Sequence, residues 1–402
     1  MGPREQRPRV VAGTIRDVNR QRVLAALRGL RTASRSNLEE ATGLSRGTVA
    51  SIVAELVDEE VLRHCGETEQ QAQAHGKGRP PERFRLASRA ALAVAVDVGR
   101  RHVRVAVGDA QGVIVAERSA VISHELPPKE ALAVAASLVT AAMADAKVTQ
   151  PHVDAAVVGL PTPVTADGKP VKRTFADLDF ARETGLARLT ERVLVMNDAD
   201  LGALGEAAFG AARGLSDFIF FKMSSGVGAG IMLGGRLYRG SGGVAGDIAH
   251  VRVREEGDWC ACGSRGCLET LISVEGVSAA LRKTHPGLGP AEIRRFLSSA
   301  DPEADGLLYG AGWKAGRALS GVVNVLNPAA IVVGGSLGTA GQALLSGLQD
   351  SISRHAQPAA ASGLRVQRAQ HGERAEVLGA LALALGLTGD GIPGVVRAPV
   401  MI

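Results

Sequence analysis

Apolar residues in the first ninety positions recur three or four residues apart in successive short stretches, which is the spacing of helices that bury one face. Residues 16–30 form the first stretch, and Ser36 is placed to cap a second helix that ends near Gly43. A third stretch, residues 46–56, follows the glycine turn and again keeps its apolar residues on one side. Two short helices joined by a glycine turn predict a helix-turn-helix.

The second helix of such a motif lies in the major groove of DNA, where the side chains at its start reach base edges. Short hydroxylated residues and a forked arginine occupy that place here: Ser45, Arg46, Thr48 and Ser51. A polar run then leads to Gly76–Pro81, which predicts a winged hairpin whose tip presents Lys77 and Arg79 to phosphates or to the minor groove. A generic helical hairpin has the same apolar pattern. The charge of the region therefore has to distinguish a DNA-binding helix-turn-helix from such a hairpin.

Beyond residue 90 the pattern changes to short runs of consecutive apolar residues that end in turns, which is typical of buried strands. These runs cover residues 91–99, 103–107, 113–116, 153–160, 193–196, 218–221, 230–233 and 330–335. Longer stretches at 128–146 and 307–326 predict helices between them. The alternation of strands and helices predicts an α/β body in which the second half repeats the theme of the first.

With 402 residues, 46% of them hydrophobic and 22% charged, the chain is long enough for two or three folded domains. Aromatic residues make up only 3%, which argues against a stacking platform for single-stranded nucleic acid. No apolar run reaches the length of a membrane span, and the first residues lack the apolar core of an export signal. Together with free thiols, these features lead us to expect a cytoplasmic protein without a membrane partner.

The net charge of +5 is concentrated near the N-terminus. Residues 1–90 carry sixteen Lys or Arg against eleven Asp or Glu, so their excess equals that of the whole chain and leaves the remainder neutral. A basic region on a neutral body is the expected footprint of a part that meets phosphate backbones. Charge and helix pattern together therefore favour binding of double-stranded DNA over a generic helical hairpin.

Three of the four cysteines lie with a histidine in an eighteen-residue segment: His250, Cys260, Cys262 and Cys267. One imidazole and three thiolates are the ligand set of a closed tetrahedral zinc site, in which the metal shapes a loop and does no chemistry. Three buried reduced cysteines or a disulfide are the alternatives, and the missing export signal argues against the disulfide. We therefore expect a structural Zn²⁺ ion.

The same segment resembles the signature of the ROK family, which comprises repressors, open reading frames of unknown function and sugar kinases. Residues 260–269 read CACGSRGCLE and match the family pattern C-x-C-G-x-x-G-C-L-E at every fixed position. Residues 246–250 read GDIAH where the family has G-E-x-G-H, with Asp247 and Ala249 as departures. The resemblance implies a winged helix-turn-helix at residues 1–88 and a two-lobed actin-like ATPase fold, with lobe 1 at 89–200 and lobe 2 with the zinc loop at 201–402.

The resemblance also implies a sugar-binding cleft. In the family's kinases, the aspartate at the position of Asp198 is the general base that takes a hydroxyl proton, so that the oxygen can attack the γ-phosphate. The residues expected to hydrogen-bond the other hydroxyls are Asn197, Asp247, His250 and Glu269, with His250 facing both the sugar and the zinc. Taken alone, Asp198 is also compatible with a simple strand-end cap.

The nucleotide half of the implied cleft departs from the kinase pattern. The family's D-x-G-G-T-K reads DVGRRH at 97–102, so Arg100 stands where a glycine lets the backbone approach the phosphates. The second phosphate loop, G-T-G-x-G, reads SSGVG at 224–228 and is less altered. Because phosphoryl transfer depends on positioning and electrostatics, we expect a kinase fold kept for sensing and not an enzyme.

These features together predict a sequence-specific transcriptional regulator, a repressor of carbohydrate uptake or catabolism genes. Its head would bind a palindromic operator as a homodimer, with a tetramer also open, and a sugar or sugar derivative would act as the effector. The alternative is an active ATP-dependent sugar kinase that carries a DNA-binding domain. A pure oligomerisation scaffold is disfavoured because it needs no cluster of carboxylates.

Overall fold

The computed structural model describes residues 15–30, 32–58, 61–65, 82–86, 91–109, 112–147, 152–299 and 301–386. The chain forms two compact units, Met1–Arg89 and Ala90–Ile402, which we name the head and the body. Within the described ranges, no helix is both long enough and apolar enough to cross a bilayer. The division of the body into lobes at residue 200 stays a prediction.

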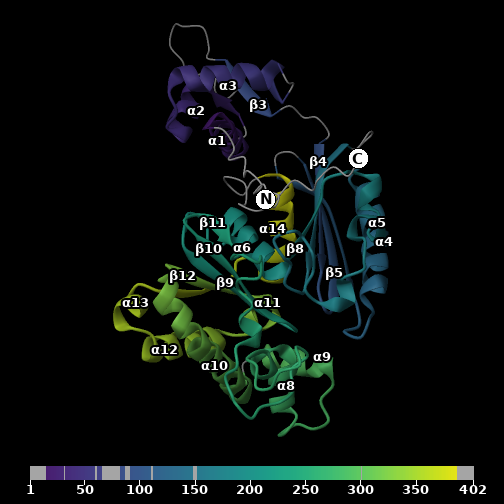
Figure 1. Cartoon of the computed structure of the whole chain (residues 1–402), viewed down its shortest axis with the longest axis vertical. Helices are drawn as coiled ribbons and strands as arrows, with labels where there is room; N and C mark the ends of the chain where they lie inside the picture. Colours follow the sequence, from purple (N-terminus) through teal and green to yellow (C-terminus); the bar gives the residue numbers. More distant parts are fainter. Residues whose placement is uncertain are drawn as a thin grey trace, which may run out of the picture. The chain divides into compact units, whose positions relative to one another are not determined.

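The head packs three helices against a small antiparallel sheet (Figure 1). Its elements are α1 (Ile15–Leu30), β1 (Ala33–Ser34), α2 (Arg35–Thr42), α3 (Arg46–Asp58), β2 (Leu62–Cys65) and β3 (Arg83–Leu86). The strands lie in the order β1-β3-β2. The inward residues of α3 form the core of the head with α1 and β3: Leu27, Val49, Ile52, Val53, Leu56 and Phe84. Helices α2 and α3 form the predicted helix-turn-helix, and β2 and β3 form the base of the predicted wing.

The cap of α2 is Ser34, and the prediction of Ser36 as the cap is wrong. The Ser34 Oγ accepts a hydrogen bond from the backbone N–H of Asn37, whose side chain accepts one from the N–H of Ser34. Pairing of Ser34 with Arg83 holds its backbone extended, which is the conformation a capping residue needs. The helix therefore starts at Arg35, while its end at Gly43, with φ of 66°, agrees with the prediction.

The body contains two five-stranded mixed sheets with the same pattern of strands. The first sheet has the order β6-β5-β4-β7-β8 and consists of β4 (Ala91–Val98), β5 (His102–Asp109), β6 (Ile114–Val121), β7 (His152–Leu160) and β8 (Val193–Asn197). The second has the order β11-β10-β9-β12-β13 and consists of β9 (Phe218–Met223), β10 (Val227–Leu233), β11 (Arg236–Tyr238), β12 (Ala330–Gly334) and β13 (Arg365–Arg368). In each sheet, three strands form an antiparallel meander and two more run parallel to the first of them. The repeat confirms the predicted α/β body with two similar halves.

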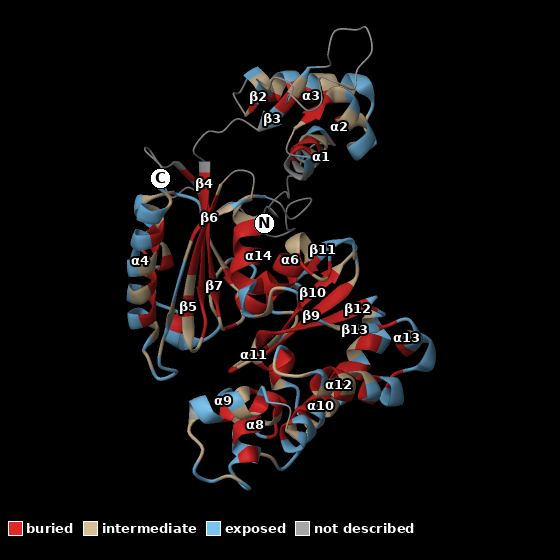
Figure 2. Ribbon diagram, turned by 180° about the vertical axis from the view of Figure 1, so that it is seen from behind, coloured by how far each residue is buried: buried red, intermediate tan, exposed pale blue. Residues whose placement is uncertain are grey.

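Helices cover both sheets, and two of them lie between the sheets (Figures 1 and 2). The helices of the body are α4 (Pro128–Asp145), α5 (Phe180–Glu183), α6 (Asp198–Phe209), α7 (Glu269–Ile272), α8 (Val274–Leu281), α9 (Pro290–Leu297), α10 (Pro302–Leu326), α11 (Gly335–Gly338), α12 (Gln342–His355), α13 (Pro358–Ser362) and α14 (Ala375–Ala384). Helix α4 packs on one face of the first sheet, and α10 and α12 pack on one face of the second. Helices α6 and α14 fill the space between the two sheets.

The period-2 pattern of the strands explains this arrangement. On β4, Val94 and Val96 point into the core under α4, whereas the smaller Ala93 and Ala95 face α14. Helices α6 and α14 also pack closely against each other at a glycine. A Cβ added at Gly205 would lie 2.1 Å from the carbonyl oxygen of Ala375, so no larger residue fits there. Small residues therefore bring the starts of both helices close to the cleft described next.

Candidate functional site

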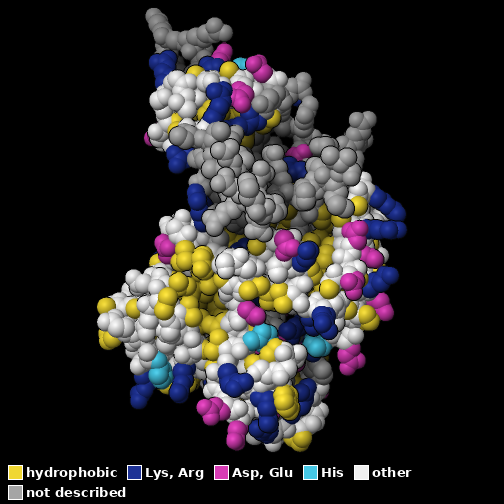
Figure 3. Space-filling view, in the orientation of Figure 1, with side chains coloured by type: hydrophobic (Ala, Val, Ile, Leu, Met, Phe, Trp, Pro, Cys, Tyr) yellow, Lys and Arg dark blue, Asp and Glu magenta, His cyan; other side chains and the backbone are white. Residues whose placement is uncertain are grey.

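A cleft of about 220 Å³ opens in the body and is lined by residues that follow the strands of both sheets. It brings together all the residues predicted to bind the sugar: Asn197, Asp198, Asp247, His250 and Glu269. On the face of the body shown in Figure 3, basic, acidic and histidine side chains lie side by side across the middle. The cleft can thus offer several donors and acceptors to one polyhydroxylated ligand.

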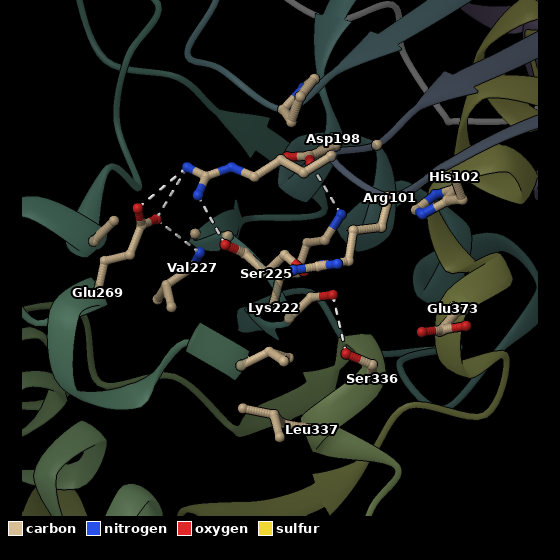
Figure 4. A pocket seen from close by; sticks show the side chains of 18 of the residues that line it. Arg101, His102, Asp198, Lys222, Ser225, Val227, Glu269, Ser336, Leu337 and Glu373 are labelled. Carbon is tan, nitrogen blue, oxygen red and sulfur yellow. Dashed lines mark hydrogen bonds and ion pairs between the residues drawn. The ribbon is translucent and has the colours of Figure 1, made fainter. Parts of the chain in front are cut away.

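Asp198 is the first residue of α6 and forms an ion pair with Lys222 of β9 (Figure 4). The Lys222 Nζ lies 2.9 Å from Oδ2 of Asp198 and 2.9 Å from Oε1 of Glu376 in α14. Burial disfavours the charge of Lys222, but Asp198 and Glu376 outweigh this effect and raise the pKa of the lysine. Lys222 therefore stays charged, and it holds the first turns of α6 and α14 on either side of one ammonium group.

Sequence reasoning missed Lys222 and Glu376, although one signal was present. Lys222 interrupts the run Phe218–Met223, in which all the other residues are buried and apolar. A lysine in the middle of a buried strand is rare unless a carboxylate lies beside it. Its partners could not be identified in advance, because Glu376 lies more than 150 positions further along the chain.

Asn197 provides the cap of α6, which Asp198 was also a candidate to provide. The Asn197 Oδ1 accepts hydrogen bonds from the backbone N–H groups of Ala199 and Asp200, at 2.9 and 3.2 Å. Its Nδ2 donates to the carbonyl oxygen of Thr162, at 3.0 Å. The side chain is thus held firmly at the wall of the cleft, and its Nδ2 also donates to Oδ1 of Asp198 at 3.3 Å, while Oδ2 of Asp198 pairs with Lys222.

A second buried ion pair fixes the edge of the cleft. The Nε of Arg239 lies 3.2 Å from Oδ2 of Asp200, and its Nη2 donates to the carbonyl oxygen of Val164 at 2.6 Å. Burial raises the pKa of Asp200 to about 7, against the opposing effect of Arg239. The pair joins the start of α6 to the segment that follows Pro161-Thr162-Pro163, and sequence reasoning did not find it.

Asp97, at the end of β4, is paired with a histidine. Its Oδ2 lies 2.7 Å from Nε2 of His102, and Arg104 and Lys222 also face it. Burial alone would raise the pKa of Asp97, but the charge and hydrogen bond of His102 lower it. Burial likewise opposes protonation of His102, yet Asp97 raises the pKa of His102. The imidazole ring fills the space beside Gly99, where an added Cβ would lie 2.3 Å from it.

We expect His102 to stabilise the body most at low pH. Since its pKa in the folded protein is raised, its contribution is fully present below about pH 6.5 and is lost as the pH rises through the raised value. The difference in unfolding midpoint between the wild type and His102→Gln should therefore shrink from pH 6 to pH 9. His124→Gln, which changes an exposed histidine of the body, serves as the control for the substitution itself. A difference that grows with pH would contradict the assignment.

Arg100 lies against residues 224–228, the loop to which the resemblance assigns phosphate binding. Its Nη1 donates to the carbonyl oxygen of Ser225 at 2.8 Å, and its Nε is 3.3 Å from where a Cβ of Gly226 would lie. Its Nη2 reaches Glu269 across the cleft. A guanidinium thus covers the backbone that the resemblance assigned to phosphate binding.

His250, Cys260, Cys262 and Cys267 form a cluster that can hold a metal ion. Their ligand atoms all lie within 4.8 Å of one another. The Cys260 Sγ is 3.5 Å from Nδ1 of His250, and the Sγ atoms of Cys262 and Cys267 are 3.6 Å apart. Ligands at about 2.0–2.3 Å from one tetrahedral ion have such separations. Burial, together with the other two thiols, raises the pKa of Cys267 to about 12, so a cation is needed to hold it as a thiolate.

The metal cluster and the cleft meet at His250. While Nδ1 of His250 faces Cys260, its Nε2 lies 3.9 Å from Oδ1 of Asp247, on the side of the cleft. Cys267 precedes Glu269 by two residues, and Glu269 begins α7. A metal bound here would therefore position residues on two sides of the cleft.

The head presents the residues predicted for base contacts at the start of α3. Ser45, Arg46 and Ser51 are exposed and Thr48 is half-buried. The Ser45 Oγ also accepts a hydrogen bond from the N–H of Thr48, so it caps the helix that it begins. Lys77 and Arg79, predicted at the tip of the wing, lie outside the described residues.

Comparisons with known proteins extend over nearly the whole chain. A model of the ROK family matches residues 93–386. The xylose repressor of Bacillus subtilis (strain 168) is 26% identical over 381 residues, covering 92% of this chain and 96% of the repressor. The glucokinase of Halalkalibacterium halodurans is 32% identical over 203 residues, covering 46% of this chain and 62% of that enzyme.

Two solved structures show the same fold. A ROK family transcriptional regulator, a homologue of the E. coli MLC protein, has a TM-score of 0.73 at 22% identity, covering 93% of this chain and 97% of its own. A ROK family glucokinase from Streptomyces griseus, in complex with glucose and AMPPNP, has a TM-score of 0.62 at 27% identity, covering 73% of this chain and 98% of its own. The likeness to regulators thus reaches into the head.

Proposed function

The chain belongs to the ROK family, and from this premise we propose that it is a sugar-responsive transcriptional repressor. Residues 1–88 would bind double-stranded operator DNA, and the body, with lobes at 89–200 and 201–402, would bind a sugar or sugar derivative in its cleft. The observation that carries the proposal is the joining of a helix-turn-helix head to a ROK body in one chain, similar to a xylose repressor over almost its full length.

The test of this function is selection of genomic DNA fragments by the purified protein at a fixed salt concentration, with and without sugars. We expect recovery of two-fold symmetric sites upstream of genes for sugar transport or catabolism, because a dimer of helix-turn-helix heads reads two half-sites. A sugar that binds the cleft should change this recovery. Recovery without any sequence preference would contradict a repressor that reads DNA unaided.

Arg46→Ala is expected to weaken binding to the recovered site about tenfold or more, because an arginine at the start of the recognition helix reads base edges. Binding to unrelated DNA should change much less. Titration of labelled site and non-site duplexes measures both. Arg118→Ala, which removes an exposed arginine of the body, is the matched control and should bind as the wild type does. Equal losses on both duplexes would assign Arg46 to phosphate contact.

Three features of the cleft support sensing without phosphoryl transfer. Asp198, the residue matching the general base, is neutralised by Lys222 at 2.9 Å. Arg100 covers Gly226 in the loop of residues 224–228, which the resemblance assigns to phosphate binding. The third feature is the hydrogen bond between His102 and Asp97, which occupies the carboxylate at the end of β4. A base tied to an ammonium group and a phosphate loop covered by a guanidinium both work against a positioned γ-phosphate.

The second candidate is a sugar kinase with a DNA-binding head, which the likeness to glucokinases favours. ATP turnover by the full chain with D-glucose, D-xylose and N-acetyl-D-mannosamine distinguishes the two. Turnover that disappears in Asp198→Asn would establish the kinase. No turnover above background, with sugar binding retained, is the result expected of a sensor.

For the metal cluster we propose Zn²⁺, since three thiolates and one imidazole are soft and borderline ligands that favour this ion in a four-coordinate site. The ion would be structural: it would link the loop of residues 250–267 to α7 and keep His250 and Glu269 in place. We also propose that the protein acts as a homodimer, as a two-fold symmetric operator requires.

A further inference from the structure

Two arginines of the turn between β4 and β5 reach from the first sheet to the part of the body that contains the second. Besides its bond to Ser225, Arg100 places Nη2 at 3.2 and 3.3 Å from the two carboxylate oxygens of Glu269. Arg101 places Nε at 3.2 Å from Oγ of Ser225 and Nη2 at 3.0 Å from Oε1 of Glu275. The two pairs differ in their carboxylates, because Glu269 is buried at the cleft whereas Glu275 is only half-buried.

Most of the hydrogen-bond acceptor positions of the Glu269 carboxylate are occupied by protein groups. A carboxylate accepts about four hydrogen bonds. Its Oε1 accepts from Arg100, and its Oε2 accepts from Arg100 and from the backbone N–H of Val227 at 3.2 Å (Figure 4). One acceptor position remains, which suffices for one hydroxyl of a ligand. A second, adjacent hydroxyl needs one of the two positions that Arg100 holds.

We infer that Arg100 is a built-in competitor of the effector, and that a ligand with two adjacent hydroxyls at Glu269 displaces it and so loosens the link between the two sheets. This inference rests on the proposed sensor function and adds its mechanism. Displacement removes the contact of Arg100 with α7, and Arg101 alone then joins the β4–β5 turn to a carboxylate of the helices, Glu275 of α8. Ligand binding and the closed link are then mutually exclusive, which is the differential affinity that a ligand-driven change requires.

The same geometry predicts that some sugars can bind in the cleft without displacing Arg100, whereas others displace it and change the link between the sheets. A sugar that presents a single hydroxyl to Glu269 can use the free acceptor position while Arg100 stays in place. A sugar with the adjacent pair has to move the guanidinium before it binds. Deoxy analogues of an active sugar that lack one of these two hydroxyls should therefore occupy the cleft without changing the link.

The experiment compares Arg100→Met with Arg101→Met in the full-length protein, using calorimetric titration with D-xylose, D-glucose and N-acetyl-D-mannosamine. Loss of a partly exposed ion pair that competes with the sugar should strengthen binding about fivefold in Arg100→Met. Arg101→Met, whose partner Glu275 is not an expected sugar ligand, should change the affinity less than twofold. Arg100→Lys, which keeps the charge without the planar guanidinium, should fall between the two.

Hydrogen exchange measures the link itself, because the exchange rates of its peptides do not depend on sugar affinity alone. In the wild type, the bound sugar should speed exchange of peptides covering residues 99–104 and 224–228. In Arg100→Met these peptides should exchange fast without sugar, and sugar should then add little. Equal or weaker sugar binding in Arg100→Met, or slower exchange on sugar binding in the wild type, would overturn the inference while leaving the sensor intact. If no protein of the set binds any of the sugars, the proposed function fails and the inference falls with it.

Discussion

Lys222→Met is expected to lower the free energy of unfolding of the body by about 3–5 kcal/mol, because it leaves buried carboxylates without their counter-charge. Lys222 lies between Asp198 and Glu376, at 2.9 Å from each, and its charge also helps to lower the pKa of the fully buried Asp97. Methionine fills a similar volume, so the loss reports the charge and not a cavity. Chemical unfolding followed by circular dichroism measures it.

An exposed pair of the same length supplies the control. Lys169 and Asp167 also lie 2.9 Å apart, but 79% and 60% of their side-chain surfaces are exposed. Lys169→Met should change the free energy of unfolding by less than about 0.5 kcal/mol. The double variant Lys222→Met, Glu376→Gln should recover part of the loss, since it removes one of the unpaired charges. Equal stabilities of Lys222→Met and Lys169→Met would show that the buried cluster is not held by this lysine.

Much of the fold follows from local patterns of apolar residues. The helical spacing in the head and the apolar runs of the body are set by which face each element buries, and β4, β7 and β9 lie where those runs predicted them. The order of the strands depends on pairing between segments far apart, such as β9 with β12, which no local pattern encodes. The family resemblance, and not the spacing of residues, pointed to the actin-like arrangement.

The misplaced cap of α2 shows how tertiary pairing decides between similar local signals. Ser34 and Ser36 are both good capping residues by composition. Only the pairing of β1 with β3 makes Ser34 extended, and β3 begins almost fifty residues later. A choice of this kind cannot be made from the sequence around the helix.

The site divides in the same way. His250, the three clustered cysteines and Asp198 were found because each belongs to a contiguous motif with a chemical reason for its spacing. Lys222, Glu376 and Arg239 were missed because each forms its ion pair with a residue that is distant in the sequence. Only the folded body brings these partners together. Arg100 was noticed as a departure from a glycine, but its pairing with Glu269 was not predicted. The contacts of Lys222, Arg239 and Arg100 are thus the least local ones of the cleft.

Cys267→Ser is expected to abolish metal binding and to lower the melting temperature of the body by roughly 5–10 °C, since a structural ion contributes directly to folding. Cys267 is fully buried two residues before Glu269, so the loss should also weaken sugar binding. Elemental analysis of the purified protein should find about one zinc per chain in the wild type and almost none in the variant. Calorimetry of both proteins measures the melting temperature.

Cys65→Ser is the matched control, because Cys65 of β2 is the one described cysteine outside the cluster. It should keep its zinc and the melting temperature of the body. A chelator should lower the melting temperature of the wild type and of Cys65→Ser but not that of Cys267→Ser. If Cys267→Ser instead retained zinc and melted with the wild type, the thiols would be ordinary buried cysteines. The proposed part of the metal in placing Glu269, the acceptor that Arg100 and the effector are inferred to share, would then have to be abandoned.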